Sequence, residues 1–149
     1  CLIIRCLGGQ FCTKRGALIV FEGLDRSGKS TQAAKLVDVL NESGRKASLQ
    51  RFPDRSTVIG GLCDAYLQQA TQLDDRCIHL LFSANRFEAV ASILERINRG
   101  ETVVVDRYSF SGIAYSVFKG LDWDWCCAPE VGLPKPDSVY FLTVSDQFV

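Results

Sequence analysis

The chain has 149 residues, of which 47% are hydrophobic and 23% charged, and its formal net charge at pH 7 is zero. This composition excludes a disordered chain, and the length suits one domain with a hydrophobic core. Because 17 basic and 17 acidic side chains balance, no overall field attracts nucleic acid or an anionic membrane. We therefore expect neither of these partners, and any anion-binding site must be local.

The first residues and the cysteines indicate the extent of the chain and its compartment. The chain lacks methionine and begins with Cys1, so we expect a piece of a longer protein, with a leader of unknown role over residues 1–14 and one domain over 15–149. The seven cysteines are odd in number, form no C-x-x-C pair and accompany a single histidine. They indicate reduced thiols in an intracellular protein. The cytoplasm is the expected location, with the nucleus and the mitochondrion left open.

Strand and helix patterns alternate along the domain. Apolar runs predict strands over residues 17–22, 47–52, 102–106 and 138–144. Helical spacing predicts helices over 29–43, from a cap at 56–57 through 59–67, from an opening at 74–75 to 97, and near 111–118. This order predicts an α/β fold in three layers, with a parallel sheet covered on both faces and ligands at the carboxyl ends of the strands. Because no helix follows the last predicted strand, we expect the fold to be incomplete at the C-terminus.

The strongest functional signal is GLDRSGKS, from Gly23 to Ser30, which matches G-x4-G-K-[ST] in full. It follows a predicted buried strand and begins a helix, as a phosphate-binding loop (P-loop) does. Glycines let backbone N–H groups approach phosphate oxygens. Lys29 can reach the β and γ phosphates of a nucleotide, and the Ser30 hydroxyl can ligate Mg²⁺. An ordinary glycine turn is the much weaker alternative.

Two more segments lie where predicted strands end. Asp106 ends an apolar strand, where a second metal-site group is expected, and Arg107 would face the same phosphates. The alternative for Asp106 is a cap on the next helix. Arg51 and Arg55 flank a Phe-Pro turn after another strand and suggest an anion-binding pair, for which the alternative is a solvated loop.

A fourth segment lies within the longest predicted helix. Phe82 and Arg86 are four residues apart and therefore share one helix face. An aromatic ring beside a guanidinium suits a planar, hydrogen-bonding ligand such as a nucleobase. The alternative is a core phenylalanine with an arginine at the rim.

Together these segments resemble the thymidylate kinase family of nucleoside monophosphate kinases, in its eukaryotic branch. The matching segments are FEGLDRSGKST (21–31), RFPDR (51–55), LFSANR (81–86), DRYSFSG (106–112) and GLPKPD (132–137). The resemblance implies a P-loop NTPase fold of the nucleoside monophosphate kinase type and ATP-dependent phosphorylation of dTMP to dTDP, a step of dTTP biosynthesis. It further implies Mg²⁺ as cofactor, a homodimer, and a cis peptide bond between Phe52 and Pro53.

The resemblance also implies roles for single residues on the ATP side. The catalytic residues would be Arg26, Lys29, Asp106 and Arg107. Arg26 and Lys29 would hold the ATP phosphates, and Ser30 and Asp106 would form the metal site. The other ATP-binding residues would be Gly23, Ser27, Gly28, Ser30 and Thr31.

The implied dTMP site uses residues from four of these segments together with Tyr115. Arg55 and Arg107 would bind the monophosphate, and Asp25 would accept a hydrogen bond from the sugar 3′-hydroxyl. Phe82 would stack on thymine, while Arg86 would donate to its carbonyl edge. Tyr115 would lie beneath the sugar, where a 2′-hydroxyl would crowd it.

Competing functions stay open at this point. A deoxynucleoside kinase shares the P-loop but takes an uncharged acceptor, so it has no use for Arg55 and Arg107. A GTPase is disfavoured because the chain has no Asn-Lys-x-Asp motif. A nucleotide-binding remnant without catalysis is the alternative from another class, because residues 145–149 stop before the lid of the family, and we expect impaired activity from a truncated chain.

Overall fold

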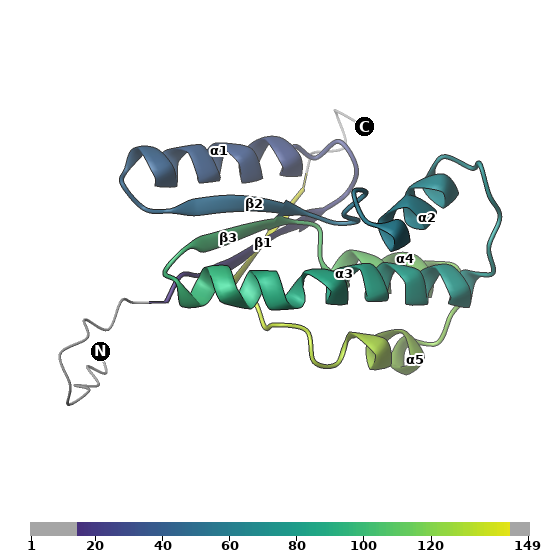
Figure 1. Ribbon diagram of the computed structural model, residues 1–149. Helices are drawn as coiled ribbons and strands as arrows, with labels where there is room; N and C mark the ends of the chain where they lie inside the picture. Colours follow the sequence, from purple (N-terminus) through teal and green to yellow (C-terminus); the bar gives the residue numbers. More distant parts are fainter. Residues whose placement is uncertain (1–14, 144–149) are drawn as a thin grey trace.

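The computed structural model describes residues 15–143, which form a four-stranded parallel sheet in the order β2-β3-β1-β4 (Figure 1). The strands are β1 (Leu18–Gly23), β2 (Ala47–Arg51), β3 (Thr102–Asp106) and β4 (Ser138–Leu142). All three strand pairs are parallel, so the predicted α/β class is confirmed. The leader over residues 1–14 and the predicted strand end at Val144 lie outside the described residues.

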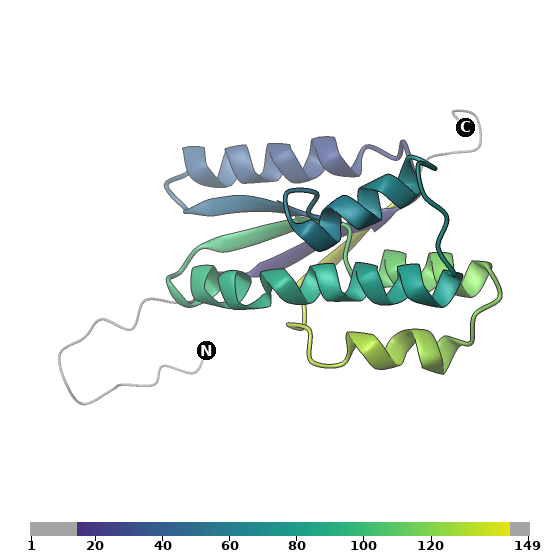
Figure 2. The same ribbon diagram turned by 45° about the vertical axis from the view of Figure 1, so that its right-hand side comes forward.

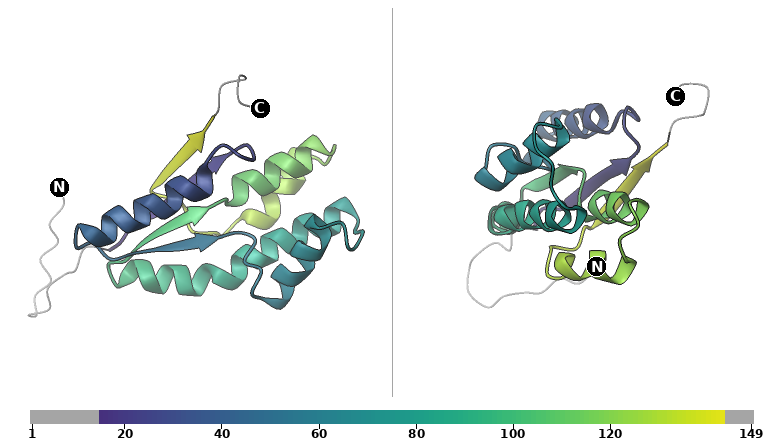
Figure 3. Two further views of the ribbon diagram at one scale, coloured as in Figure 1. Left: turned by 90° about the horizontal axis from the view of Figure 1, so that it is seen from above. Right: turned by 90° about the vertical axis from the view of Figure 1, so that its right-hand side faces the viewer.

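Helices cover both faces of this sheet. They are α1 (Lys29–Glu42), α2 (Val58–Leu67), α3 (Asp75–Asn98), α4 (Ser109–Phe118) and α5 (Trp123–Cys127), with the short 3-10 helix η1 (Ala128–Glu130). α1 lies on one face, while α3 and α4 lie on the other (Figures 1 and 3). α2 packs beside α3 beyond the end of β2 (Figure 2). The arrangement is the predicted three-layer α/β/α fold.

The alternation of side chains along β3 builds a core on each face. Val103 and Val105 pack with Leu18, Val20, Ile93 and Ile97 on the α3 face. Val104 points the other way and packs with Phe21 of β1 and Ala33 of α1. Successive strand residues face opposite sides of a sheet, so a continuous apolar run is what a strand covered on both faces requires.

Two helical features differ from the sequence prediction. α4 begins at Ser109, two residues before the predicted start at residue 111. α5 and η1 were not predicted, because segments of five and three residues are too short to show helical periodicity. α5 is set by a cap, since Asp122 Oδ1 accepts a hydrogen bond from Trp125 N at 2.8 Å.

α3 combines length with an apolar composition, and on those two criteria alone it could cross a membrane. Its buried face, however, includes His79, Asn85 and Arg86, which hydrogen-bond to neighbouring elements. Ile93 and Ile97 pack on the sheet. This is the pattern of a core helix in a globular domain.

The cysteines of the described segment are free thiols. Cys63 and Cys126 are buried, Cys127 is half-buried and Cys77 is exposed. Burial raises the pKa of Cys63 to about 11, so this thiol is protonated and unreactive at neutral pH. Cys1, Cys6 and Cys12 lie outside the described residues.

Candidate active site

The register of the sheet brings three functional segments to one edge. Asp106 at the end of β3 pairs with Phe21 of β1 on one side and with Arg51 of β2 on the other. The segments that follow these strands therefore begin side by side. They are the P-loop after β1, the loop of Arg55 after β2, and the turn of Arg107 after β3.

The P-loop connects β1 to α1 through left-handed backbone. Arg26 has φ 63° and Gly28 has φ 85°, and Gly28 is the N-cap of α1. This conformation directs backbone N–H groups towards a common centre at a helix N-terminus, which favours an anion. A cavity of about 350 Å³ lies over the loop, and its lining residues are Asp25, Arg26, Gly28, Lys29, Ser30, Thr31 and Arg107.

Lys29 is the buried cation of this loop, with 5% of its surface exposed. Its ammonium group donates a hydrogen bond to Leu24 O and lies 3.5 Å from Ser27 Oγ. Burial lowers the pKa of Lys29 below its ordinary value, and the positive charge of Arg107 lowers it further. A polyphosphate beside this group would supply the negative charge that a buried ammonium requires.

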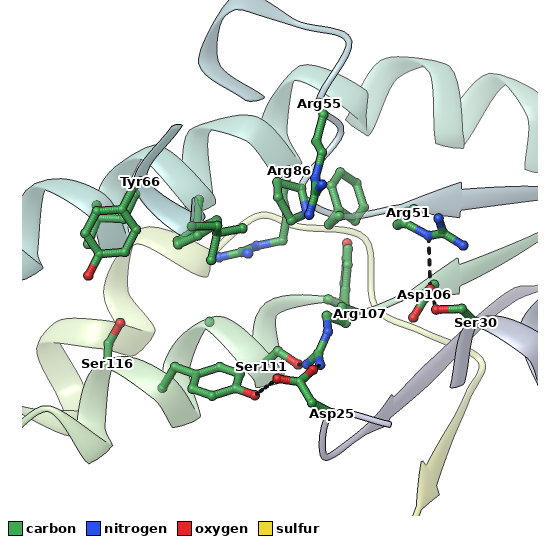
Figure 4. A pocket seen from close by; sticks show the side chains of 18 of the residues that line it. Asp25, Ser30, Arg51, Arg55, Tyr66, Arg86, Asp106, Arg107, Ser111 and Ser116 are labelled. Atoms are coloured by element: carbon green, nitrogen blue, oxygen red, sulfur yellow. Dashed lines mark hydrogen bonds and ion pairs between the residues drawn. The ribbon is translucent and has the colours of Figure 1, made fainter. Parts of the chain in front are cut away.

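Ser30, Asp106 and Arg51 meet at one carboxylate oxygen (Figure 4). Ser30 Oγ donates to Asp106 Oδ2 at 2.5 Å, and Arg51 Nε donates to the same oxygen at 3.1 Å. A hydroxyl and a carboxylate are hard oxygen ligands and fit Mg²⁺, which takes its remaining ligands from water and substrate phosphates. Residues 15–143 contain no cluster of three or more His, Cys, Asp or Glu side chains that could hold an ion by themselves.

The alternative role of Asp106, a cap on α4, is wrong. Its carboxylate binds Ser30 and Arg51, and the N-cap residue Tyr108 makes no side-chain cap. Glu22 takes that role instead, since its Oε1 accepts hydrogen bonds from Tyr108 N at 2.8 Å and from Ser111 N at 3.2 Å.

Arg107 joins the P-loop to α4. Its backbone is left-handed, with φ 69°, and its side chain donates to the Asp25 carboxylate and, at 3.0 Å, to Ser111 Oγ. Tyr115 closes the group: its hydroxyl lies 3.5 Å from Asp25 Oδ2, and the guanidinium of Arg107 lies 5.9 Å from its ring centroid. Residues predicted to bind the sugar and the monophosphate are thus in contact.

The two arginines of the RFPDR segment separate in the structure. Arg51 pairs with Asp106, whereas Arg55 Nη1 lies 3.1 Å from Asp64 Oδ1 of α2, an ion pair without hydrogen-bond geometry. Both line the main cavity. The Phe52–Pro53 peptide bond is cis, which confirms the prediction.

The main cavity has a volume of about 630 Å³ and is shown in Figure 4. All residues predicted to bind dTMP line it, namely Asp25, Arg55, Phe82, Arg86, Arg107 and Tyr115. Ser30 and Asp106 line it at the P-loop end. Phe82 is half-buried and Arg86 is buried, so both belong to the cavity wall, as a nucleobase site requires.

Sequence reasoning missed three buried polar residues that hold these side chains in place. Glu22 fixes the turn of Arg107, Asn85 hydrogen-bonds the loop of Arg55, and Glu130 pairs with Arg86. Glu22 ends an apolar strand, and Asn85 lies on the buried face of a helix, so a polar residue at an apolar position was the available signal. Nothing in the local sequence distinguishes Glu130.

Comparisons with known proteins find similarity to one family. Residues 21–148 match the family model "Thymidylate kinase". The thymidylate kinase of Schizosaccharomyces pombe is 60% identical over 130 residues, which cover 87% of this chain and 62% of that protein. The human thymidylate kinase is 56% identical over 87% of this chain and 61% of its own length. The chain thus spans about three fifths of these curated relatives.

Solved structures agree with the sequence matches. The thymidylate kinase of Candida albicans superimposes with a TM-score of 0.79 at 43% identity, covering 89% of this chain and 65% of that one. The thymidylate kinase of Ehrlichia chaffeensis superimposes with a TM-score of 0.77 at 29% identity, covering 89% and 79%.

Proposed function

Because the chain belongs to the thymidylate kinase family, we propose that it transfers the γ-phosphoryl group of ATP to dTMP and forms dTDP. The observation that carries the proposal is the junction of two cavities. The 630 Å³ cavity holds the predicted dTMP-binding residues and shares Asp25, Ser30 and Arg107 with the P-loop cavity. A monophosphate bound in the first would face the terminal phosphate of a nucleotide bound in the second.

On the acceptor side, the charges match a nucleoside monophosphate. Arg55 and Arg107 bind the 5′-phosphate, since both guanidinium groups line the cavity. Asp25 accepts from the sugar 3′-hydroxyl, and Tyr115 packs beneath the sugar. At the other end of the cavity, Phe82 and Arg86 bind the thymine, and the argument for Arg86 is developed below.

On the donor side, Lys29, Arg26 and the backbone N–H groups of the P-loop neutralise the phosphates of ATP. Ser30 and Asp106 would hold Mg²⁺, which, when bound, offsets negative charge on the β and γ oxygens. Phosphoryl transfer depends on positioning and charge neutralisation more than on covalent chemistry, and this site contains the groups for both.

The deoxynucleoside kinase alternative is less favoured, because its uncharged acceptor would bring no phosphate to Arg55 and Arg107 in the acceptor cavity. A remnant that only binds nucleotide would have the same binding site as the proposed kinase but would not turn over substrate. Homodimer formation and an intracellular location stay predictions.

The test is an assay with ATP, Mg²⁺ and dTMP in which ion-exchange chromatography separates the nucleotides. We expect dTDP and ADP in equal amounts, and no dTMP when thymidine replaces dTMP as acceptor. Arg55→Ala should abolish dTMP binding in calorimetry, while Arg45→Ala, a change at an exposed arginine after α1, should not. Binding of dTMP without product would support the remnant, and phosphorylation of thymidine would support the deoxynucleoside kinase.

A further inference from the structure

The guanidinium of Arg86 is fixed by a buried ion pair. Arg86 Nε donates to Glu130 Oε2 at 2.9 Å, and Nη2 donates to Glu130 Oε1. The two side chains are only 3% and 7% exposed. Two parallel hydrogen bonds between a guanidinium and a carboxylate set the plane of the guanidinium as well as its position. η1, which carries Glu130, thereby orients a side chain of α3.

The pairing with Glu130 leaves some N–H donors of Arg86 without a partner among residues 15–143. A guanidinium has five N–H donors and no acceptor, and Glu130 engages one on Nε and one on Nη2. Among residues 15–143, nothing accepts a hydrogen bond from Arg86 Nη1, although Arg86 lines the main cavity. Figure 4 shows the guanidinium extending along the cavity wall. Nη1 is therefore available to donate to a ligand in the cavity, and the ion pair with Glu130 fixes its direction.

Gly112 of α4 provides the space for this arrangement. A Cβ atom on Gly112 would lie 2.9 Å from Arg86 Nη2, 3.2 Å from Nη1 and 3.4 Å from Cζ. The guanidinium thus lies directly against the backbone of α4, where any side chain would displace it. The displaced atoms belong to a guanidinium that is held in a buried ion pair, so a methyl group there would move the donor and strain that pair.

We propose that Glu130 is a positioning residue, and Gly112 a specificity-determining one, which together aim Arg86 Nη1 at the base and select a pyrimidine with a carbonyl rather than an amino group at position 4. The inference rests on the proposed function. Thymine and uracil present an acceptor to this donor. Cytosine presents an amino group, so two donors would face each other and the Arg86 N–H would lose its partner.

The experiment measures dissociation constants of dTMP, dUMP and dCMP by calorimetry on the full chain, with a thermal melt for each variant. The wild type should bind dTMP and dUMP at least about tenfold more tightly than dCMP. Gly112→Ala should lower the melting temperature, because the methyl group displaces a guanidinium held in a buried ion pair, and should weaken dTMP binding about tenfold with a smaller preference over dCMP. Glu130→Gln should shift the preference in the same direction, and Glu130→Asp should restore part of it.

The matched control is Glu95→Gln, which removes an acid from an exposed ion pair with Arg99 on the same helix. It should leave the preference for dTMP over dCMP unchanged. A folded Gly112→Ala variant with the wild-type preference would overturn the inference, and this variant decides the matter if Glu130→Gln does not fold. A wild type that binds no dTMP would overturn the proposed function and this inference together.

Discussion

The side-chain amide of Asn85 hydrogen-bonds both backbone groups of Asp54. Asp54 N donates to Asn85 Oδ1 at 2.7 Å, and Asn85 Nδ2 donates to Asp54 O at 3.1 Å. The same Nδ2 lies 3.1 Å from Thr57 Oγ1, the side chain that caps α2. α3 therefore holds the loop that carries Arg55, in addition to supplying Arg86 to the cavity. A single helix thus holds in place both Arg55 and Arg86, the arginines proposed to bind the phosphate and the base.

Replacing Asn85 with alanine should lower the stability of the protein and weaken dTMP binding. The change leaves the buried amide and carbonyl of Asp54 without partners, so we expect a loss of about 2–3 kcal/mol in the free energy of unfolding. Binding of dTMP should weaken about tenfold, because Arg55 would no longer be held in place. Urea unfolding and calorimetry measure the two effects. The control is Asn98→Ala, at an exposed position of the same helix. A folded Asn85→Ala variant with wild-type affinity would show that the loop holds Arg55 by itself.

Glu22 should hold Arg107 in place as Asn85 holds the loop of Arg55. Besides the backbone N–H groups of Tyr108 and Ser111, its carboxylate accepts a hydrogen bond from Ser111 Oγ, which in turn accepts from Arg107. Glu22→Ala removes all three bonds to a residue that is 3% exposed. We expect a loss of at least about 2 kcal/mol in stability and weaker dTMP binding. Glu42→Ala, at the exposed end of α1, is the control and should change neither. Unchanged dTMP affinity in Glu22→Ala would mean that the turn of Arg107 is set by its backbone alone.

Cavity residues that lie at the ends of strands or on one face of a helix could be predicted from the sequence. Asp106 ends a strand, and the P-loop and Arg107 directly follow strands. Because a parallel sheet brings strand ends together, the convergence of these residues could be inferred without coordinates. Phe82 and Arg86 share a helix face by spacing alone.

The supporting residues could not be inferred, because their partners lie far away in the chain. Glu130 binds a residue 44 positions earlier, and Glu22 binds one 86 positions later. Such pairs follow from the packing of η1 and α4, and η1 itself was too short to predict. Arg51 lines the same cavity as Arg55, but its contact with Asp106 follows from the register of β2 and β3 and could not be inferred from the RFPDR segment itself.

Lys29→Ala should separate catalysis from acceptor binding. Lys29 lines the P-loop cavity and not the main one, so its charge acts on the donor phosphates. We expect turnover to fall about 10²–10³-fold, because the ammonium stabilises charge that develops during transfer. The dissociation constant of dTMP should change less than about twofold. Lys35→Ala, at an exposed site on α1, is the control. A parallel loss of dTMP affinity would contradict the assignment of Lys29 to the donor side.

Glu101, at the turn between α3 and β3, should make the stability of the protein depend on acid pH. The hydrogen bond from Ser48 Oγ lowers the pKa of Glu101 below its ordinary value of 4.5; burial opposes this effect, and Lys46, with Nζ 3.5 Å from Oε2, adds to it. The unfolded chain therefore takes up this proton at a higher pH than the folded chain does. The stabilisation is complete well above pH 4.5 and is lost as the pH falls through the lowered pKa of the folded state.

The variant that tests this dependence is Glu101→Gln. At pH 7 we expect it to be less stable than the wild type by about 1–2 kcal/mol, since a charged acceptor becomes neutral. The difference should shrink as the pH is lowered below 4.5, because the wild type then loses the same charge. Urea unfolding at a series of pH values measures it, with the exposed Glu95→Gln as control. A difference that stays constant down to about pH 3 would show that Glu101 stabilises the fold by packing and not by its charge.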